Sequence, residues 1–133
     1  MVTNANATPA VFAGHFPGRS PIDAYGNGGF RFAGMSHRGS ILCLPSGVWA
    51  WDAETADELD LARFARVLAE LERPDFLLLG TGRQQIFASL DVRWAFDAKG
   101  IGLDTMDTGA AARTYNILLA EQRRVSVALI AVG

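Results

Sequence analysis

The sequence predicts a single α/β domain of three layers, with a mixed central sheet, a C-terminal βαβαβ unit and an N-terminal antiparallel β segment. Three observations support this fold class. Residues 76–132 alternate between short apolar runs and segments of helical spacing, the pattern of parallel strands joined by crossover helices. Residues 29–51 form short β-like runs separated by turns. The chain of 133 residues is 50% hydrophobic and 20% charged, which suits one globular core.

The beginning of the chain differs in composition from the rest. Residues 1–20 are mostly small and polar, and prolines such as Pro9 and Pro17 alternate with glycines. Both residue types interrupt regular structure. We therefore expect a flexible or surface-draped lead-in over residues 1–20, regular structure from about Ile22, and a single α/β domain over residues 21–133.

The next part of the chain is expected to form antiparallel strands. Three runs of β-forming residues lie at 29–32, 40–44 and 48–51, with turn residues between them. Two aromatic pairs stand at alternate positions of these strands, so each pair points to one face. They are Phe30 with Phe32, and Trp49 with Trp51. We expect core positions for them, and the alternative is an exposed aromatic patch for a protein partner.

A helix is predicted over residues 56–72. Five apolar side chains show the i, i+3, i+4, i+7, i+10 spacing of one helical face. They are Leu61, Phe64, Ala65, Leu68 and Leu71. Upstream, Thr55 and Glu58 match a capping box, in which each side chain satisfies the backbone N–H of the other residue. Pro74 is expected to end the helix.

The second half of the chain predicts the βαβαβ unit. Its expected strands are residues 76–79, 101–105 and 125–132, and its expected helices are residues 90–98 and 110–122. Gly100 follows the first helix at the position where left-handed geometry favours glycine. Strands joined in this way are parallel and covered by helices. The last run has Ser126 as its one polar residue, so we expect a central strand.

Charge and composition exclude several kinds of partner. Twelve basic and fourteen acidic residues give a net charge of −2 without a basic stripe, so nucleic acid is not expected. No run approaches about 18 apolar residues, so an integral membrane protein is not expected. The single cysteine, Cys43, lies in an apolar run and is expected to be a buried thiol. With no recognisable signal peptide, a cytoplasmic location is expected.

Two loops of the predicted sheet carry candidate binding residues. Ligands of open parallel sheets lie beyond the carboxyl ends of the strands, where the loops 80–85 and 106–109 are expected. The candidates in these loops are Gly80, Thr81, Gly82, Arg83, Asp107 and Thr108. One interpretation is a small-anion pocket, because glycines allow close backbone approach and Arg83 could pair with an anion. The other is a pair of ordinary turns with Asp107 or Thr108 as a helix N-cap.

The helix after the second loop carries a further polar set. Its candidate residues are Arg113, Thr114, Tyr115 and Asn116. Arg113 lies one turn into the helix, near the loop 106–109. One interpretation is that these residues bind a ligand or partner. The other is that they are structural, with Arg113 paired to a loop carboxylate and Tyr115 packed in the core.

No catalytic residue, metal site or cofactor is predicted. The chain lacks the lysine and glycine spacing of a P-loop, the G-x-G-x-x-G of a dinucleotide site and the G-x-S-x-G of a nucleophile elbow. His15 and His37 lie far apart in the sequence, and neither has a second ligand at zinc spacing.

Residues 106–125 read MDTGAAARTYNILLAEQRRV. This stretch, together with Tyr25, Gly28-Gly29-Phe30 and residues 77–82, resembles a family of small uncharacterised bacterial proteins. Eukaryotic relatives of the family include mitochondrial complex I assembly factor 3 and an adipogenesis-associated domain protein. The resemblance implies a compact three-layer α/β domain without an established enzymatic activity. Its motif positions here are Gly80, Thr81, Gly82, Asp107, Thr108, Arg113, Thr114, Tyr115, Asn116, Glu121 and Arg124, and the chain departs from it at Ala112 and Gln122.

Three functions follow from these observations. The first, which the resemblance favours, is a non-enzymatic protein-interaction domain with a protein partner, an accessory factor in the assembly of membrane-associated complexes. The second is a small-anion or metabolite-binding domain, or an enzyme, that uses the loops 80–85 and 106–109. The third is a homo-oligomer subunit that associates through the aromatic β segment.

Overall fold

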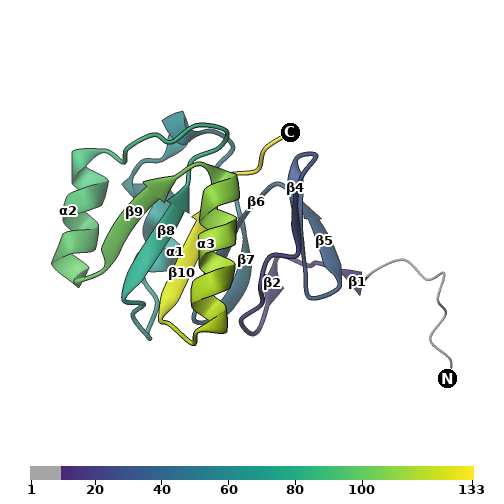
Figure 1. The fold of residues 1–133 in the computed structure, drawn as a ribbon. Helices are drawn as coiled ribbons and strands as arrows, with labels where there is room; N and C mark the ends of the chain where they lie inside the picture. The colour runs from purple at the N-terminus through teal and green to yellow at the C-terminus, as the bar shows by residue number, and fades with distance from the viewer. Residues whose placement is uncertain (1–9) are drawn as a thin grey trace, which may run out of the picture.

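The computed structural model describes residues 10–133 and shows the predicted α/β domain (Figure 1). A six-stranded mixed sheet forms its centre. The strands are β2 (His15–Phe16), β6 (Ser40–Leu44), β7 (Gly47–Trp51), β8 (Phe76–Gly80), β9 (Gly102–Met106) and β10 (Val125–Leu129). Their order is β2-β7-β6-β10-β8-β9. Because β10 pairs in parallel with β8 and antiparallel with β6, the predicted central place of this strand is confirmed.

A second, four-stranded sheet packs on one face of the central sheet. Its strands are β1 (Ala10–Val11), β3 (Ala24–Gly26), β4 (Gly29–Phe32) and β5 (Met35–Arg38). Their order is β1-β5-β4-β3, with antiparallel pairing from β5 to β3 and parallel pairing of β1 to β5. The predicted N-terminal antiparallel segment is therefore present, and its strands are divided between the two sheets.

Helices cover both faces of the central sheet, which gives the predicted three layers. They are α1 (Ala65–Leu68), α2 (Leu90–Lys99) and α3 (Thr108–Ala120). The helix α3 shares one face with the small sheet, and α1 and α2 lie on the other (Figure 1). Gly100 ends α2 with a left-handed φ of 70°, as predicted. Asp107 caps α3, because its carboxylate accepts a hydrogen bond from the N–H of Ala110 at 2.9 Å.

The core consists of two hydrophobic clusters, one on each face of the central sheet. Alternate residues of β8 supply both: Leu77 and Leu79 pack with the side of α1 and α2, and Leu78 packs with the side of α3. Phe30 and Phe32 are buried against the α3 side, which confirms their predicted core positions. A homo-oligomer through this segment stays a prediction, and buried phenylalanines do not support it.

The second aromatic pair lies on the opposite side of the core. Trp51 is buried, and its indole N–H donates to the Arg63 carbonyl at 2.8 Å. Trp49 is half-buried, with the guanidinium of Arg66 3.7 Å above its ring and the imidazole of His15 stacked on it. The indole of Trp49 is therefore covered by two other side chains.

The prediction of a single helix over residues 56–72 is wrong. The segment holds two short 3-10 helices, η1 (Ala56–Glu58) and η2 (Leu61–Phe64), before the single turn of α1. The Glu58 carboxylate accepts from the N–H of Thr55 at 2.9 Å, so this half of the capping box forms. The Asp60 carboxylate then accepts from the N–H of Arg63 at 3.1 Å and starts a new turn. This restart changes the helical phase, so Phe64 is buried whereas Leu61 and Leu71 are exposed.

Regular structure begins before Ile22. Residues 1–9 of the expected lead-in lie outside the described residues. From residue 10, β1 pairs with β5 and β2 pairs with β7, so the segment runs across both sheets. The rings of Phe12 and Phe16 lie 5.1 Å and 6.3 Å from the ring of Phe32. Aromatic packing of this kind stabilises a segment whose strands are only two residues long.

Candidate partner-binding site

The two candidate loops lie side by side at the carboxyl ends of β8 and β9. The N–H of Gly82 donates to the Thr108 hydroxyl at 3.0 Å, and the N–H of Thr108 donates to the Gly82 carbonyl at 2.8 Å. The Thr108 hydroxyl donates in turn to the carbonyl of Ile130 at 2.7 Å. The loops 80–85 and 106–109 therefore form one packed unit, held through a buried threonine.

Most polar groups of these loops are bound within the protein. The Thr81 hydroxyl donates to the carbonyl of Gln84 and accepts from the N–H of Ile86 at 2.9 Å. Arg83 is exposed and donates to the carbonyl of Gly133 at 2.9 Å. A side chain at Gly80 would overlap Leu129 and come within 3.0 Å of the Cα of Thr108. The glycine at this position thus permits close packing between the end of β8 and the start of α3.

The candidate residues of α3 separate onto different faces of the helix. Tyr115 points into the core, where its hydroxyl lies 3.3 Å from the Ser20 carbonyl and burial raises its pKa. Asn116 binds the backbone of Ile22 twice: its Oδ1 accepts from the N–H and its Nδ2 donates to the carbonyl, both at 2.8 Å. Thr114 is half-buried, and Arg113 is exposed. Of this set, Arg113 and Asn116 face the segment that leads into β3.

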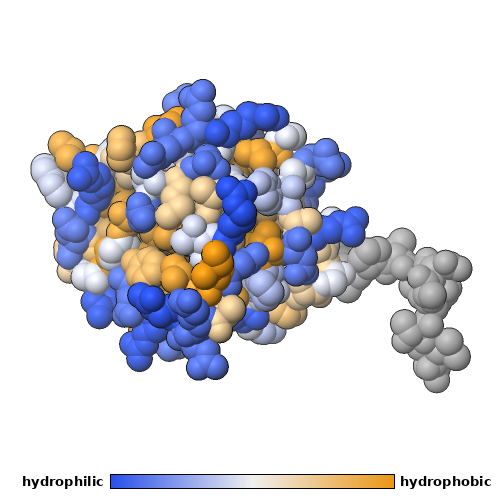
Figure 2. Space-filling model, in the orientation of Figure 1, coloured by the Kyte–Doolittle hydropathy of each residue, from blue (hydrophilic) through white to orange (hydrophobic). Residues whose placement is uncertain are grey.

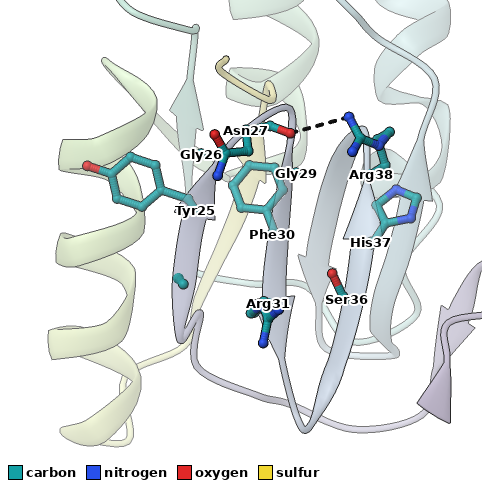
Figure 3. Close-up of a pocket in the computed structure, with 10 residues that line it drawn as sticks. Tyr25, Gly26, Asn27, Gly29, Phe30, Arg31, Ser36, His37 and Arg38 are labelled. Carbon is teal, nitrogen blue, oxygen red and sulfur yellow. Dashed lines mark hydrogen bonds between the residues drawn. The ribbon is translucent and has the colours of Figure 1, made fainter. Parts of the chain in front are cut away.

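An open cleft lies between α3 and β3. It has a volume of about 340 Å³ and is lined by Ile22, Asp23, Ala24, Tyr25, Ala112, Arg113 and Asn116. Tyr25 points from β3 toward α3, as Figure 3 shows, and its hydroxyl accepts a hydrogen bond from Nη1 of Arg113 at 3.2 Å. The Tyr25–Arg113 cleft thus joins residues from two distant parts of the chain.

A smaller depression on the small sheet continues this surface. It has a volume of about 230 Å³ and is lined by Ala24, Tyr25, Gly26, Asn27, Gly29, Phe30, Arg31, Ser36, His37 and Arg38 (Figure 3). Arg38 donates to the carbonyl of Asn27 at 3.5 Å. Ala24 and Tyr25 line both the depression and the cleft. One surface therefore extends from α3 over β3 to β4 and β5.

Three arginines, Arg31, Arg38 and Arg113, give this surface its positive charge. Within residues 10–133 both ion pairs belong to Arg63, which lies on η2, so these three have no carboxylate partner there. A guanidinium has five N–H donors, and Arg113 uses one of them on Tyr25. The others can bind a carbonyl or carboxylate group. Asp23 supplies the one acidic side chain of the cleft.

The lining of the Tyr25–Arg113 cleft differs from the predicted set of residues in two respects. The sequence prediction placed Arg113 and Asn116 together with the loops and left Tyr25 out of the candidate residues. Tyr25 and Arg113 are 88 positions apart, so no local spacing relates them. The signal that could have found Tyr25 is its place in the family resemblance. The lining residues offer an aromatic ring, a guanidinium, a carboxamide and a carboxylate, which are groups that can pack against or hydrogen-bond to another molecule.

The family model described as "Protein of unknown function (DUF498/DUF598)" matches residues 22–130. The chain belongs to this family, and the resemblance inferred from the sequence is confirmed. An uncharacterized protein of Rhodobacter capsulatus is 36% identical over 115 residues, which cover 86% of this chain and 87% of that protein.

Two further comparisons extend the relationship. NADH dehydrogenase (ubiquinone) 1 alpha subcomplex assembly factor 3 of Mus musculus is 27% identical over 121 residues, which cover 91% of this chain and 65% of that factor. The crystal structure of an outer membrane protein from Bartonella henselae superposes with a TM-score of 0.86 at 51% identity, and covers 90% of this chain and 100% of that one. Within residues 10–133, no helix has the length and apolar character needed to cross a bilayer.

Proposed function

We propose that this protein is a non-enzymatic accessory factor that binds another protein through the Tyr25–Arg113 cleft. The observation that carries the proposal is the exposed Tyr25 side chain, hydrogen-bonded to an arginine that has no carboxylate partner among residues 10–133. Tyrosine and arginine are among the residue types that contribute most of the binding energy at protein interfaces. The likeness to an assembly factor supports a partner that belongs to a membrane-associated complex during its assembly.

The shape of the surface supports a polypeptide as the bound molecule. The cleft is open and continues into the depression on the small sheet, so an extended segment fits along it. A carbonyl or carboxylate of that segment would meet Arg113, and an apolar side chain would pack on the ring of Tyr25, which is 42% exposed. We propose a cytoplasmic location, because a single cysteine cannot form an internal disulfide and fits a reducing compartment.

Site-specific photo-crosslinking in the native cell tests the proposal. A benzophenone amino acid at Tyr25 is expected to give a discrete adduct with one protein, and Arg113→Ala is expected to reduce that adduct about tenfold, the loss of roughly one good contact. The same amino acid at Leu71 is the matched control, because Leu71 is fully exposed and follows α1 on the opposite layer. An adduct of equal yield from both positions, or no adduct from Tyr25, would reject the proposal.

The alternative is a small anionic metabolite bound at Arg113. The observation that favours it is the size of the cleft, about 340 Å³, which lies at the lower end of the usual range for ligand pockets. A thermal-shift screen against a panel of metabolites and anions distinguishes the two. A dose-dependent rise in midpoint that Arg113→Ala abolishes supports the metabolite, since a ligand that prefers the folded state raises its stability. An unchanged midpoint across the panel removes it.

A further inference from the structure

The helix α2 carries apolar side chains on two opposite faces. Val92 and Phe96 are buried in the core, as one amphipathic face requires. Leu90 and Trp94 are also four residues apart, but on the outer face, where they are 58% and 65% exposed. In Figure 2, apolar colour appears among blue side chains over the N-terminal end of α2. Packing in the core therefore explains the apolar residues on the inner face of this helix but not those on its outer face.

A groove lies beside the N-terminal end of α2 and ends at Ser89, the residue before the helix. Ile86 and Phe87, in the segment before the helix, are 44% and 76% exposed. They line a groove of about 200 Å³ together with Leu59 and Leu79, opposite η1. We term it the Phe87 groove. Single exposed apolar residues are ordinary on protein surfaces, but four of them lie within residues 86–94, and two of these line one groove.

The rim of the Phe87 groove is acidic. Asp57 lines the groove itself. The segments that contribute lining residues, together with α2, are residues 52–64 and 86–99, and they contain seven carboxylates, two arginines and one lysine. One of these arginines, Arg63, is already paired with Asp52 at 3.1 Å and Glu58 at 3.4 Å. These segments therefore have an excess of four negative charges, whereas the whole chain has a net charge of −2.

Local hydrogen bonds lower the pKa of two of these carboxylates. The Glu58 carboxylate accepts from the N–H groups of Glu54 and Thr55, and these bonds hold its pKa below the usual value. The Asp91 carboxylate accepts from the hydroxyl of Ser89, which also lines the groove, and its pKa is lowered by this bond. Both carboxylates are ionised at neutral pH, and Glu58 is also paired with Arg63, whereas Asp57 in the groove has no ion pair among residues 10–133.

We infer that the Phe87 groove and the outer face of α2 bind a basic amphipathic segment of a partner protein. Its apolar side chains would fill the groove and cover Leu90 and Trp94, and its lysines or arginines would meet the carboxylates around Asp57 and Asp91. A second copy of this chain would bring the same acidic rim against itself, and an anionic bilayer would be repelled by it. Charge complementarity therefore favours a cationic partner.

This surface is separate from the Tyr25–Arg113 cleft. The cleft lies on the layer of α3 and presents arginines, whereas the Phe87 groove lies on the layer of η1 and α2 and presents carboxylates. The two sites have opposite charge, so they select different segments. Peptide binding in the Phe87 groove is therefore independent of partner binding in the Tyr25–Arg113 cleft.

Titration with a synthetic peptide tests the inference. The probe is an amphipathic peptide of about 14 residues, close to four helical turns, with leucine and phenylalanine on one face and lysine on the other. The emission of the exposed Trp94 is expected to shift to the blue on binding, and Trp94→Phe is expected to remove that shift. The twin peptide with glutamate in place of each lysine is expected to bind at least about tenfold more weakly.

Variants of the groove complete the test, with binding measured by the anisotropy of a labelled peptide. Phe87→Ser and Asp57→Lys are each expected to weaken the lysine peptide about tenfold. Leu71→Ser, which removes another exposed leucine, and Arg113→Ala are expected to leave its affinity unchanged. Equal binding of the two peptides, or full affinity in a folded Phe87→Ser variant, would overturn the inference. So would a dimer, or binding to phosphatidylcholine vesicles, that Phe87→Ser abolishes.

Discussion

Gly109, in the first turn of α3, lies directly against the hydroxyl of Tyr25. A methyl group at position 109 would overlap that hydroxyl and come within 3.2 Å of Nη1 of Arg113. The observed hydrogen bond between Tyr25 and Arg113 therefore depends on a neighbouring residue that has no side chain. This relationship links the start of α3, which the two candidate loops hold in place, to the proposed binding site.

The variant Gly109→Ala is expected to alter the site without weakening the fold. The far end of the Tyr25 side chain can move into solvent, and alanine favours a helix over glycine by up to about 1 kcal/mol. We expect a thermal midpoint equal to or above that of the wild type, together with about tenfold less partner adduct from a benzophenone amino acid at the exposed Ala24, which lines the cleft and leaves Tyr25 in place. An unchanged adduct in Gly109→Ala would show that the position of the Tyr25 ring does not matter for binding.

Asn116 is expected to stabilise the fold by attaching the segment before β3 to α3. The variant Asn116→Ala removes both hydrogen bonds to Ile22 and should lower the free energy of unfolding by about 1–3 kcal/mol. Asn116→Asp retains an acceptor for the N–H of Ile22 but places a carboxylate oxygen against the Ile22 carbonyl, so its stability should be no higher than that of the alanine variant. Urea denaturation measures all three, and an aspartate variant as stable as the wild type would contradict this account.

Thr108 is expected to be a structural residue of the two loops. In Thr108→Val the side chain keeps its shape, but the buried N–H of Gly82 loses its acceptor and the Ile130 carbonyl loses its donor. We expect a loss of about 1–3 kcal/mol in the free energy of unfolding. Thr108→Ser retains the hydroxyl and is the matched control. Equal stability of the valine and serine variants in thermal denaturation would show that the hydroxyl has no such role.

Cys43 is expected to be unreactive in the folded protein. Burial raises the pKa of its thiol to about 12, and the thiolate is the nucleophilic form. At pH 8 a disulfide reagent should therefore label Cys43 only in molecules that unfold, and the labelling rate should increase with urea in parallel with global unfolding. Rapid labelling of the native protein in the absence of denaturant would disprove this expectation.

His37 is expected to make stability depend on pH. Burial lowers its pKa in the folded protein below the value of 6.5 that the unfolded chain retains. Above that value both states are neutral at this position. As the pH falls below about 6.5, the unfolded state takes up the proton first, so the free energy of unfolding decreases. His37→Gln should reduce this decrease between pH 7 and pH 5, with His15→Gln as the control for loss of an imidazole.

The sequence predicts the buried strands well, because their signal is local. The apolar runs of β8 and β10 are long enough to identify strands covered on both faces. The failed helix over residues 56–72 shows the limit of periodicity: Asp60 starts a new turn, and a pattern of apolar residues does not include that competing cap. The burial of the leucines in this segment therefore depends on where each short helix begins.

The binding surfaces are harder to predict, because they depend on distant residues. Tyr25 and Arg113 meet only after β3 is placed beside α3, and nothing in the spacing of either segment requires that pairing. The outer face of α2 presents a related difficulty. Val92 with Phe96 and Leu90 with Trp94 have the same spacing, so the sequence shows two apolar faces but not which one is inside.

The place of β10 has a consequence for synthesis of the protein. This strand follows every other strand along the chain, yet it lies between β6 and β8, at the middle of the sheet (Figure 1). On the ribosome, the antiparallel half of the sheet and the β8–β9 pair both emerge before residues 125–129. Each half then has an open edge, which is a site for wrong pairing with another chain. The nascent domain stays in this vulnerable state until β10 inserts between its two halves.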